Sequence, residues 1–159
     1  MSNRLKMEAG VGAFIKTPDG VLLVKKNYGP LKDRWTFPEG YVDNRENFQE
    51  ALKRELKEEI NASVEIKDLL AVRQRTDKKR NCYFVFDCLL KNKKGLRISS
   101  PREIKEWRFF KKTEIADDPK VYSLVKIISK KSGTNRKLRQ TNFRPKELKV
   151  KLKNYLLFS

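Results

Sequence analysis

The segment over residues 47–60 has the clearest periodicity in the chain. Four large apolar residues recur there at every fourth position, namely Phe48, Leu52, Leu56 and Ile60. Such spacing places them in one stripe along an α-helix. Asn61 follows the stripe, and asparagine accepts the left-handed backbone that ends many helices. The segment therefore predicts an amphipathic helix whose apolar stripe must be covered by another layer of the fold.

Strand-like runs stand on both sides of this helix. Residues 9–16 and 21–26 are largely apolar, and the Thr-Pro-Asp-Gly stretch between them predicts a hairpin. Three further runs are rich in β-branched and aromatic residues and predict strands: 64–74, 82–91 and 107–110.

The remaining segments are predicted as follows. Residues 27–40 contain two glycines and two prolines and predict a loop. A second helix is expected within residues 116–133, with Pro119 near its first turn and Gly133 after its end. Strands, a helix, strands and a helix indicate an α/β layered domain.

Acidic side chains gather on the first helix although the whole chain carries a net charge of +18. Glu55, Glu58 and Glu59 fall within about 100° of one another on a helix, beside the apolar stripe. No lysine or arginine follows one turn later to relieve their repulsion. The cluster favours binding of a cation, although an ordinary charged surface helix remains the alternative.

The residue types in the chain restrict the chemistry. The sequence contains no histidine, which excludes Ser-His-Asp and Cys-His nucleophile systems and zinc sites that need imidazole. Three carboxylates are hard oxygen ligands suited to magnesium, manganese or calcium, and magnesium best fits a site shared with phosphates. A spare glutamate can take a proton from water, and Arg54 can orient a carboxylate such as that of Glu46.

The pattern over residues 40–62 resembles the Nudix box of the Nudix hydrolases. That signature reads Gly, five residues, Glu, seven residues, then Arg-Glu-hydrophobic-x-Glu-Glu-x-Gly-hydrophobic, and seven of its nine constrained positions match. Asn61 and Ala62 stand where the box has Gly and a larger hydrophobe. The preceding Trp-Thr-Phe-Pro-Glu-Gly is similar to the family's Pro-Gly-Gly lead-in, with Glu39 in place of one glycine.

The resemblance implies an α/β/α sandwich with a mixed β-sheet and an Mg²⁺- or Mn²⁺-dependent hydrolysis of nucleoside diphosphate derivatives. It assigns ion binding to Glu55, Glu58 and Glu59, with a backbone carbonyl of Glu39 or Gly40. It assigns orienting roles to Arg54 and Glu46. Glu55, Glu58 and a later glutamate are the candidate catalytic groups, Glu103 being preferred over Glu106 for the latter.

Candidate substrate contacts are basic or aromatic. Arg73 and Arg75 share one face of a strand, and Lys25 and Arg34 flank the loop before the box, so all four are expected to meet phosphates. Tyr28, Tyr83 and Phe84 are candidates to stack on a base. Core packing is the alternative for Tyr83 and Phe84, which lie in an apolar run.

The C-terminal extension is strongly basic. Residues 130–159 contain ten Lys and Arg and one Glu, half of the net charge of the chain. We expect a Nudix-like hydrolase domain over residues 1–131 and an extension over 132–159 packed on it as an amphipathic helix. The Leu-Lys-Val-Lys-Leu-Lys stretch over residues 148–153 also alternates like a strand, which is the alternative. The substrate is expected to be a nucleotide sugar such as ADP-ribose, or a nucleoside triphosphate.

Two other functions stay open. One is an RNA 5′-end pyrophosphohydrolase that holds RNA with the basic tail, and the other is a non-catalytic nucleotide- or RNA-binding module. A Lys-rich, well-solvated surface is the plain alternative reading of the charge. Cys82 and Cys88 lie too far apart on one strand to form a disulfide, so reduced cysteines and a cytoplasmic location are expected. The sequence contains no long apolar stretch, so no membrane contact is expected.

Overall fold

The computed structural model describes residues 6–76, 80–132, 140–142 and 155–158. Its elements follow one another in the order β1 (Glu8–Thr17), β2 (Gly20–Lys26), β3 (Trp35–Thr36), β4 (Glu39–Tyr41), α1 (Phe48–Ile60), β5 (Val64–Arg75), β6 (Asn81–Leu90), the 3₁₀ turn η1 (Lys93–Gly95), β7 (Ile104–Phe110), α2 (Lys112–Asp117), α3 (Ser123–Lys131), β8 (Gln140–Asn142) and β9 (Tyr155–Phe158). No helix in these ranges is long and apolar enough to cross a membrane.

The sheet forks at its first strand. The strand order is β3-β2-β1-β6-β5-β9-β8, with β4 paired to β1 and β7 paired to β2. One edge of β1 runs parallel to β6 along the length of the strand. Its other edge pairs with β4 through residues 10–12 and with β2 only at Lys16 and Thr17. The sheet therefore opens between β2 and β4 on this edge.

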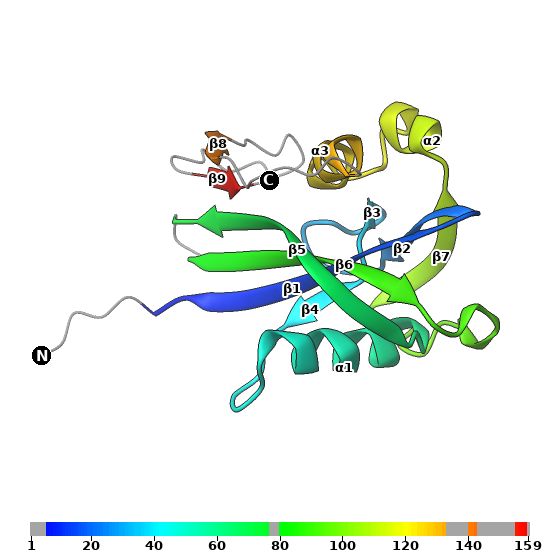
Figure 1. The fold of residues 1–159 in the computed structure, drawn as a ribbon, viewed down its shortest axis with the longest axis horizontal. Helices are drawn as coiled ribbons and strands as arrows, with labels where there is room; N and C mark the ends of the chain where they lie inside the picture. The colour runs from blue at the N-terminus through cyan, green and yellow to red at the C-terminus, as the bar shows by residue number, and fades with distance from the viewer. Residues whose placement is uncertain (1–5, 77–79, 133–139, 143–154, 159) are drawn as a thin grey trace, which may run out of the picture.

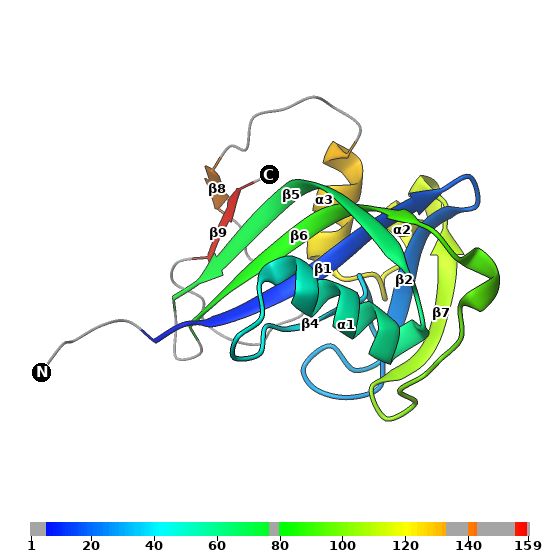
Figure 2. The ribbon, with the colours of Figure 1, turned by 60° about the horizontal axis from the view of Figure 1, so that its bottom comes forward.

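Helices cover both faces of the sheet. Figure 1 shows α1 on one side and α2 with α3 on the other, and Figure 2 shows α1 lying across β1 and β4. Ala51, Leu52, Leu56 and Ile60 of α1 belong to one apolar cluster, and the residues of α2 and α3 belong to a second cluster on the opposite face. The predicted α/β/α arrangement with a mixed sheet is confirmed.

The local elements agree with the sequence patterns. β1 and β2 form the predicted hairpin, with Lys16 opposite Val21. Helix α1 begins after Asn47 and ends at Asn61, whose φ of 52° is left-handed as expected. The strands predicted over 64–74, 82–91 and 107–110 correspond to β5, β6 and β7.

Two local predictions were wrong. The expected loop over residues 27–40 contains β3 and the start of β4, because these short strands form by pairing with β2 and β1. The segment before α3 contains a separate short helix, α2, so that Pro119 lies in the connection between them, outside the first turn of α3. Gly133 lies outside the described residues.

The C-terminal extension adds strands to the sheet. β9 pairs antiparallel with β5, so that Arg73 is opposite Leu157 and Arg75 is opposite Tyr155. Leu157 is buried in the cluster that contains α3. The amphipathic helix predicted for the extension is therefore wrong at Tyr155–Phe158, and residues 143–154 lie outside the described part of the chain. β-Ladder pairing of this segment with a distant strand overrides its helical periodicity.

Candidate active site

The acidic helix α1 is fixed at both ends. At its start, the Asn47 carboxamide oxygen accepts hydrogen bonds from the backbone N–H groups of Gln49 and Glu50 at 3.0 and 2.9 Å. The Glu50 carboxylate in turn accepts from the backbone of Asn47, which completes a capping box. At its end, the backbone N–H groups of residues 61 and 62 bond to the last turn. The acidic side chains in the second half of α1 therefore project from a rigid element.

Arg54 ties the preceding loop to this helix. Its Nε and Nη2 donate to the two oxygens of Glu46 at 2.7 and 3.0 Å, and Nη2 also donates to the Tyr41 carbonyl. The predicted Arg54–Glu46 contact is therefore present, and it is bidentate. The hydrogen bonds from Arg54 and from the Asp43 backbone lower the pKa of Glu46 to about 2.

Glu55 lies directly against the backbone of Gly40. A Cβ on Gly40 would stand 1.9 Å from the Glu55 carboxylate carbon, so any side chain at that position would displace the Glu55 carboxylate. Arg54 Nη1 donates to Glu55 Oε1 at 2.8 Å. Burial raises the pKa of Glu55, against the effect of Arg54, and the charges of Glu58 and Glu103 add to the increase.

Glu58 and Glu59 point in different directions. The Glu58 side chain is 58% exposed and is 3.3 Å from Arg54 Nη1. The Glu59 side chain is fully buried, with Oε1 accepting from Lys26 Nζ at 2.8 Å and Oε2 accepting from the Glu39 backbone at 3.0 Å. Burial raises the pKa of Glu59 to about 7 although the Lys26 ion pair acts in the opposite direction.

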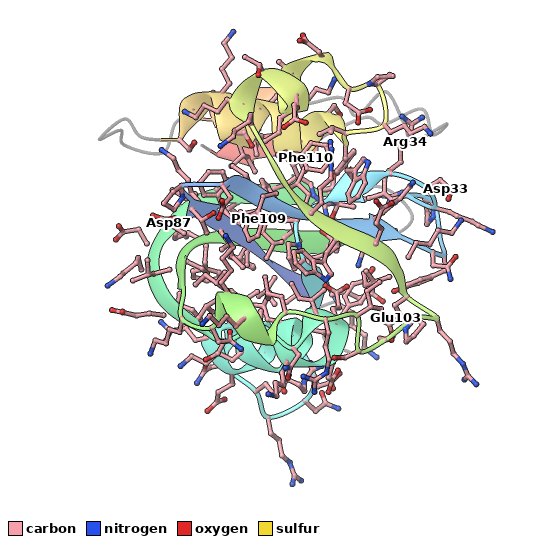
Figure 3. All side chains as sticks on the ribbon, turned by 90° about the vertical axis from the view of Figure 1, so that its right-hand side faces the viewer. Asp33, Arg34, Asp87, Glu103, Phe109 and Phe110 are labelled. Carbon is pink, nitrogen blue, oxygen red and sulfur yellow. The ribbon has the colours of Figure 1, made fainter. Side chains whose placement is uncertain are left out.

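The loop that carries Glu103 is attached to the site from two sides. The backbone of Ser99 donates to the Glu59 carbonyl at 2.9 Å, and the backbone of Asn27 donates to the Glu103 carbonyl at 2.7 Å. Figure 3 shows Glu103 on the α1 side of the sheet, at the loop entering β7. Glu106, the alternative candidate, lies within β7 and pairs with Lys25 at 3.4 Å.

A pocket of about 230 Å³ opens beside Glu39 and Gly40. Tyr28 and Tyr41 line it with more than half of each side chain exposed. Arg73 and Arg75 also line it, and Arg73 Nη1 donates to the Asn81 side chain at 2.7 Å. The pocket therefore combines aromatic rings with cationic groups next to the acidic helix.

Some candidate substrate residues are not at this pocket. Lys25 lies over the Trp35 ring at 5.4 Å, and Arg34 Nη1 donates to the Pro119 carbonyl at 2.6 Å. Figure 3 shows Arg34 on the α2–α3 side of the sheet, away from Glu103. Phe84 stacks on Phe48 with ring centroids 4.3 Å apart, which supports core packing for Phe84. The sequence position of Lys25 and Arg34 near the box did not predict these side-chain directions.

Lys26 is a site residue whose contact the sequence patterns missed. Its ammonium group is buried against the Glu59 carboxylate. The signal was present in the strand alternation. Lys26 continues the positions of Leu22 and Val24, which face α1, so a lysine on this buried face needed an acidic partner.

The glutamates of α1 have the chemistry to bind a divalent cation, but in this structure their carboxylates form ion pairs with Arg54 and Lys26. The described residues contain no group of three acidic or cysteine side chains arranged to hold an ion. Glu55 and Glu58 contact Arg54, while Glu59 contacts Lys26. Carboxylate oxygens are nevertheless the ligands that Mg²⁺ and Mn²⁺ prefer, and Glu59 already binds a cation in the form of the Lys26 ammonium.

Known proteins share this fold and part of this sequence. The chain is 28% identical over 100 residues to an ADP-ribose pyrophosphatase from Methanocaldococcus jannaschii, an alignment that covers 63% of the chain and 59% of that protein. The chain thus spans less than two thirds of the length of this relative. A solved NUDIX hydrolase from Nitrosomonas europaea is 29% identical with a TM-score of 0.62, over 70% of this chain and 61% of that one.

A second solved structure matches more of the fold. A MutT NUDIX hydrolase from Burkholderia pseudomallei superposes with a TM-score of 0.69 over 80% of this chain and 99% of that chain, at 23% identity. The family model for the NUDIX domain matches residues 6–130, which include β1, the acidic helix and α3. The chain therefore belongs to the NUDIX domain family.

Proposed function

We propose that this chain is a metal-dependent pyrophosphohydrolase that cleaves the diphosphate linkage of a nucleoside diphosphate derivative. The observation that carries the proposal is the contact of the Glu55 carboxylate with the Gly40 backbone, beside the pocket. Nudix hydrolases generally use divalent metal ions. Glu55, Glu58 and Glu59 are the proposed ion ligands, with a carbonyl oxygen of Glu39 or Gly40.

Each group has a defined role in this proposal. A bound Mg²⁺ or Mn²⁺ supplies Lewis acidity, which withdraws charge from the bridged phosphates and activates water. Arg54 and Glu46 keep the loop and helix in fixed register, so that Glu55 stays over Gly40. Glu103, or one of the helix glutamates, accepts the proton of the attacking water as the bridging P–O bond breaks.

The proposed substrate is a nucleotide sugar such as ADP-ribose or a nucleoside triphosphate. Tyr28 and Tyr41 provide exposed rings for stacking, and Arg73 and Arg75 provide positive charge in the same pocket. The activity in the name of the Methanocaldococcus jannaschii relative, ADP-ribose pyrophosphatase, supports testing ADP-ribose first.

Phosphomonoester formation tests the proposal. The wild type is incubated with ADP-ribose, other nucleotide sugars, dinucleotides and nucleoside triphosphates in the presence of Mg²⁺ or Mn²⁺, and products are separated by chromatography. We expect turnover of at least one compound, and a loss of about 100-fold or more in Glu55→Gln with the fold intact. Binding of these compounds without hydrolysis under every metal condition would identify a non-catalytic module instead.

An RNA 5′-end pyrophosphohydrolase is the second candidate. The observation that favours it is the pairing of β9 with β5, which places residues 155–158 of the extension beside Arg73 and Arg75 at the pocket. Affinity for 5′-triphosphorylated RNA would then fall steeply with salt, because phosphate contacts release counterions. Affinity that does not respond to salt would remove this candidate.

A further inference from the structure

Lys26 is buried at the meeting point of three elements of the site. Its Nζ lies 2.8 Å from Glu59 Oε1 on α1 and 3.9 Å from Glu39 Oε1 on β4, and its side chain is only 8% exposed. Lysine side chains are almost never fully buried without a partner, because the ammonium group loses its water. The burial of Lys26 is therefore explained by the Glu59 and Glu39 carboxylates next to its ammonium group.

The backbone on both sides of this lysine is fixed. The Lys26 N–H donates to the Arg34 carbonyl at 3.1 Å, and the Lys26 carbonyl accepts from the Asp33 N–H at 2.9 Å. The acceptor is fixed too, since the second oxygen of Glu59 is held by the Glu39 N–H. The long side chain of Lys26 extends from this fixed backbone to the fixed Glu59 carboxylate.

The charges explain why an ammonium stands there. Glu59 is fully buried and Glu39 is close to it, so two carboxylates share one poorly hydrated space. The Lys26 ammonium donates to Glu59 Oε1 at 2.8 Å and lies 3.9 Å from Glu39 Oε1, so one cation stands between the two acidic side chains. The Lys26 ammonium thus neutralises the site where the acidic helix meets β4.

We propose that the Lys26 ammonium occupies the cation position at Glu59 and that a divalent ion must displace it to reach that carboxylate. The inference rests on the proposed function, which assigns Glu59 to ion binding. An ammonium and a divalent ion at one carboxylate oxygen repel each other strongly at this burial. Lys26 also lines the pocket, so the displaced ammonium has an open space that the anionic substrate would enter. Lys26 is a positioning residue that lowers ion affinity when no substrate is bound.

The affinity for Mn²⁺ alone tests this competition. Isothermal titration calorimetry at mildly alkaline pH compares the wild type, Lys26→Met and Lys16→Met. The control removes the same charge from an exposed position on β1 that no part of the site uses. We expect Lys26→Met to bind Mn²⁺ about ten-fold more tightly than the wild type, and Lys16→Met to change affinity by less than about two-fold. Equal or weaker binding by a folded Lys26→Met protein overturns the proposal.

A second measurement uses the wild type, because Lys26→Met leaves Glu59 buried without its partner and can fail to fold. Lysine modification by an amine-reactive reagent is followed by peptide mass spectrometry with and without Mg²⁺. We expect Mg²⁺ to accelerate modification of Lys26 while Lys16 reacts at the same rate in both samples. An unchanged Lys26 rate at a Mg²⁺ concentration that calorimetry shows to be saturating overturns the displacement.

The two measurements separate this inference from the proposed function. Ion binding without any movement of Lys26 contradicts only the inference and leaves the metal-dependent hydrolase in place. An absence of Mn²⁺ and Mg²⁺ binding in both the wild type and Lys26→Met contradicts the proposed metal dependence, and the inference falls with it.

Discussion

The Glu55 carboxylate rests on the backbone of Gly40, fifteen residues earlier in the chain, so closely that a Cβ at Gly40 would lie 1.9 Å from the carboxylate carbon. This contact joins the short strand β4 to the second half of α1. The absence of a side chain at residue 40 therefore lets the Glu55 carboxylate lie against the β4 backbone.

Gly40→Ala is expected to reduce activity by about 100-fold or more, because the added methyl group forces Glu55 out of its position. Steady-state kinetics with a compound that the wild type hydrolyses measures the loss, and the melting temperature shows whether the fold survives. Gly95→Ala is the control for a clash away from the pocket, since its Cβ would meet the Asn92 side-chain nitrogen at 2.6 Å. If Gly40→Ala retained full kcat, Glu55 would not need to stand against this backbone.

The Arg54–Glu46 pair makes part of the stability dependent on pH. The folded-state pKa of Glu46 is about 2, below its ordinary value of 4.5, so this carboxylate binds fewer protons in the folded than in the unfolded state. Its contribution is present above about pH 4.5 and is lost as the pH falls toward 2.

Glu46→Gln removes that contribution and leaves the size of the side chain almost unchanged. The free energy of unfolding of Glu46→Gln should lie below that of the wild type at neutral pH, and the two curves should converge as the pH falls below 4.5. Urea unfolding at a series of pH values measures both curves. If the free energies of unfolding of the two proteins differed by the same amount across the acid range, the charge of Glu46 would not be the source of that difference.

The two cysteines are expected to react at different rates with thiol reagents. Cys88 is buried, and burial raises the pKa of its thiol to about 12, so little thiolate forms near neutral pH. Cys82 is partly exposed and lines the pocket, although burial raises its pKa as well. Native protein treated with iodoacetamide should therefore carry the label first at Cys82 by mass spectrometry.

A ligand in the pocket should protect Cys82 from that label. ADP-ribose is added in the absence of metal, so that hydrolysis does not remove it, and Cys88 labelling in denaturant serves as the reference for reagent activity. Labelling of Cys82 at the same rate with saturating ligand would place the ligand outside this pocket.

β9 is expected to contribute to stability through its buried leucine. Leu157 is 1% exposed and packs in the cluster that contains α3. Leu157→Ala should lower the free energy of unfolding by about 2–5 kcal/mol, as truncation of a buried leucine does. Leu89→Ala, at a site that is 51% exposed, is the control and should change it by less than about 1 kcal/mol. Equal effects would mean that β9 is not packed as a core strand in solution.

Short-range patterns predicted the acidic helix well. The four-residue apolar period and the left-handed Asn61 both depend on residues within a few positions of one another. The same holds for the β1–β2 hairpin, whose strands are joined by a short turn. It holds also for Arg54 and Glu46, which lie in one helix and the loop before it. Such features could be predicted because their partners are fixed by chain connectivity.

The side-chain directions of the substrate candidates could not be predicted in the same way. Arg73 and Arg75 line the pocket, whereas Lys25 and Arg34 turn to Trp35 and Pro119. The sequence did not distinguish the two arginines from Lys25 and Arg34, because the direction of each side chain depends on which element packs beside it.

The sequence by itself determined the helix, its acidic face and the family resemblance, because these depend on spacing along one continuous segment. Only the tertiary structure decided that β3 and β4 are strands, that β9 joins β5, and that Lys26 faces Glu59 across thirty-three positions. Those contacts join segments that local propensity leaves undecided. Their stability comes from pairing and burial that exist only once distant parts of the chain have met.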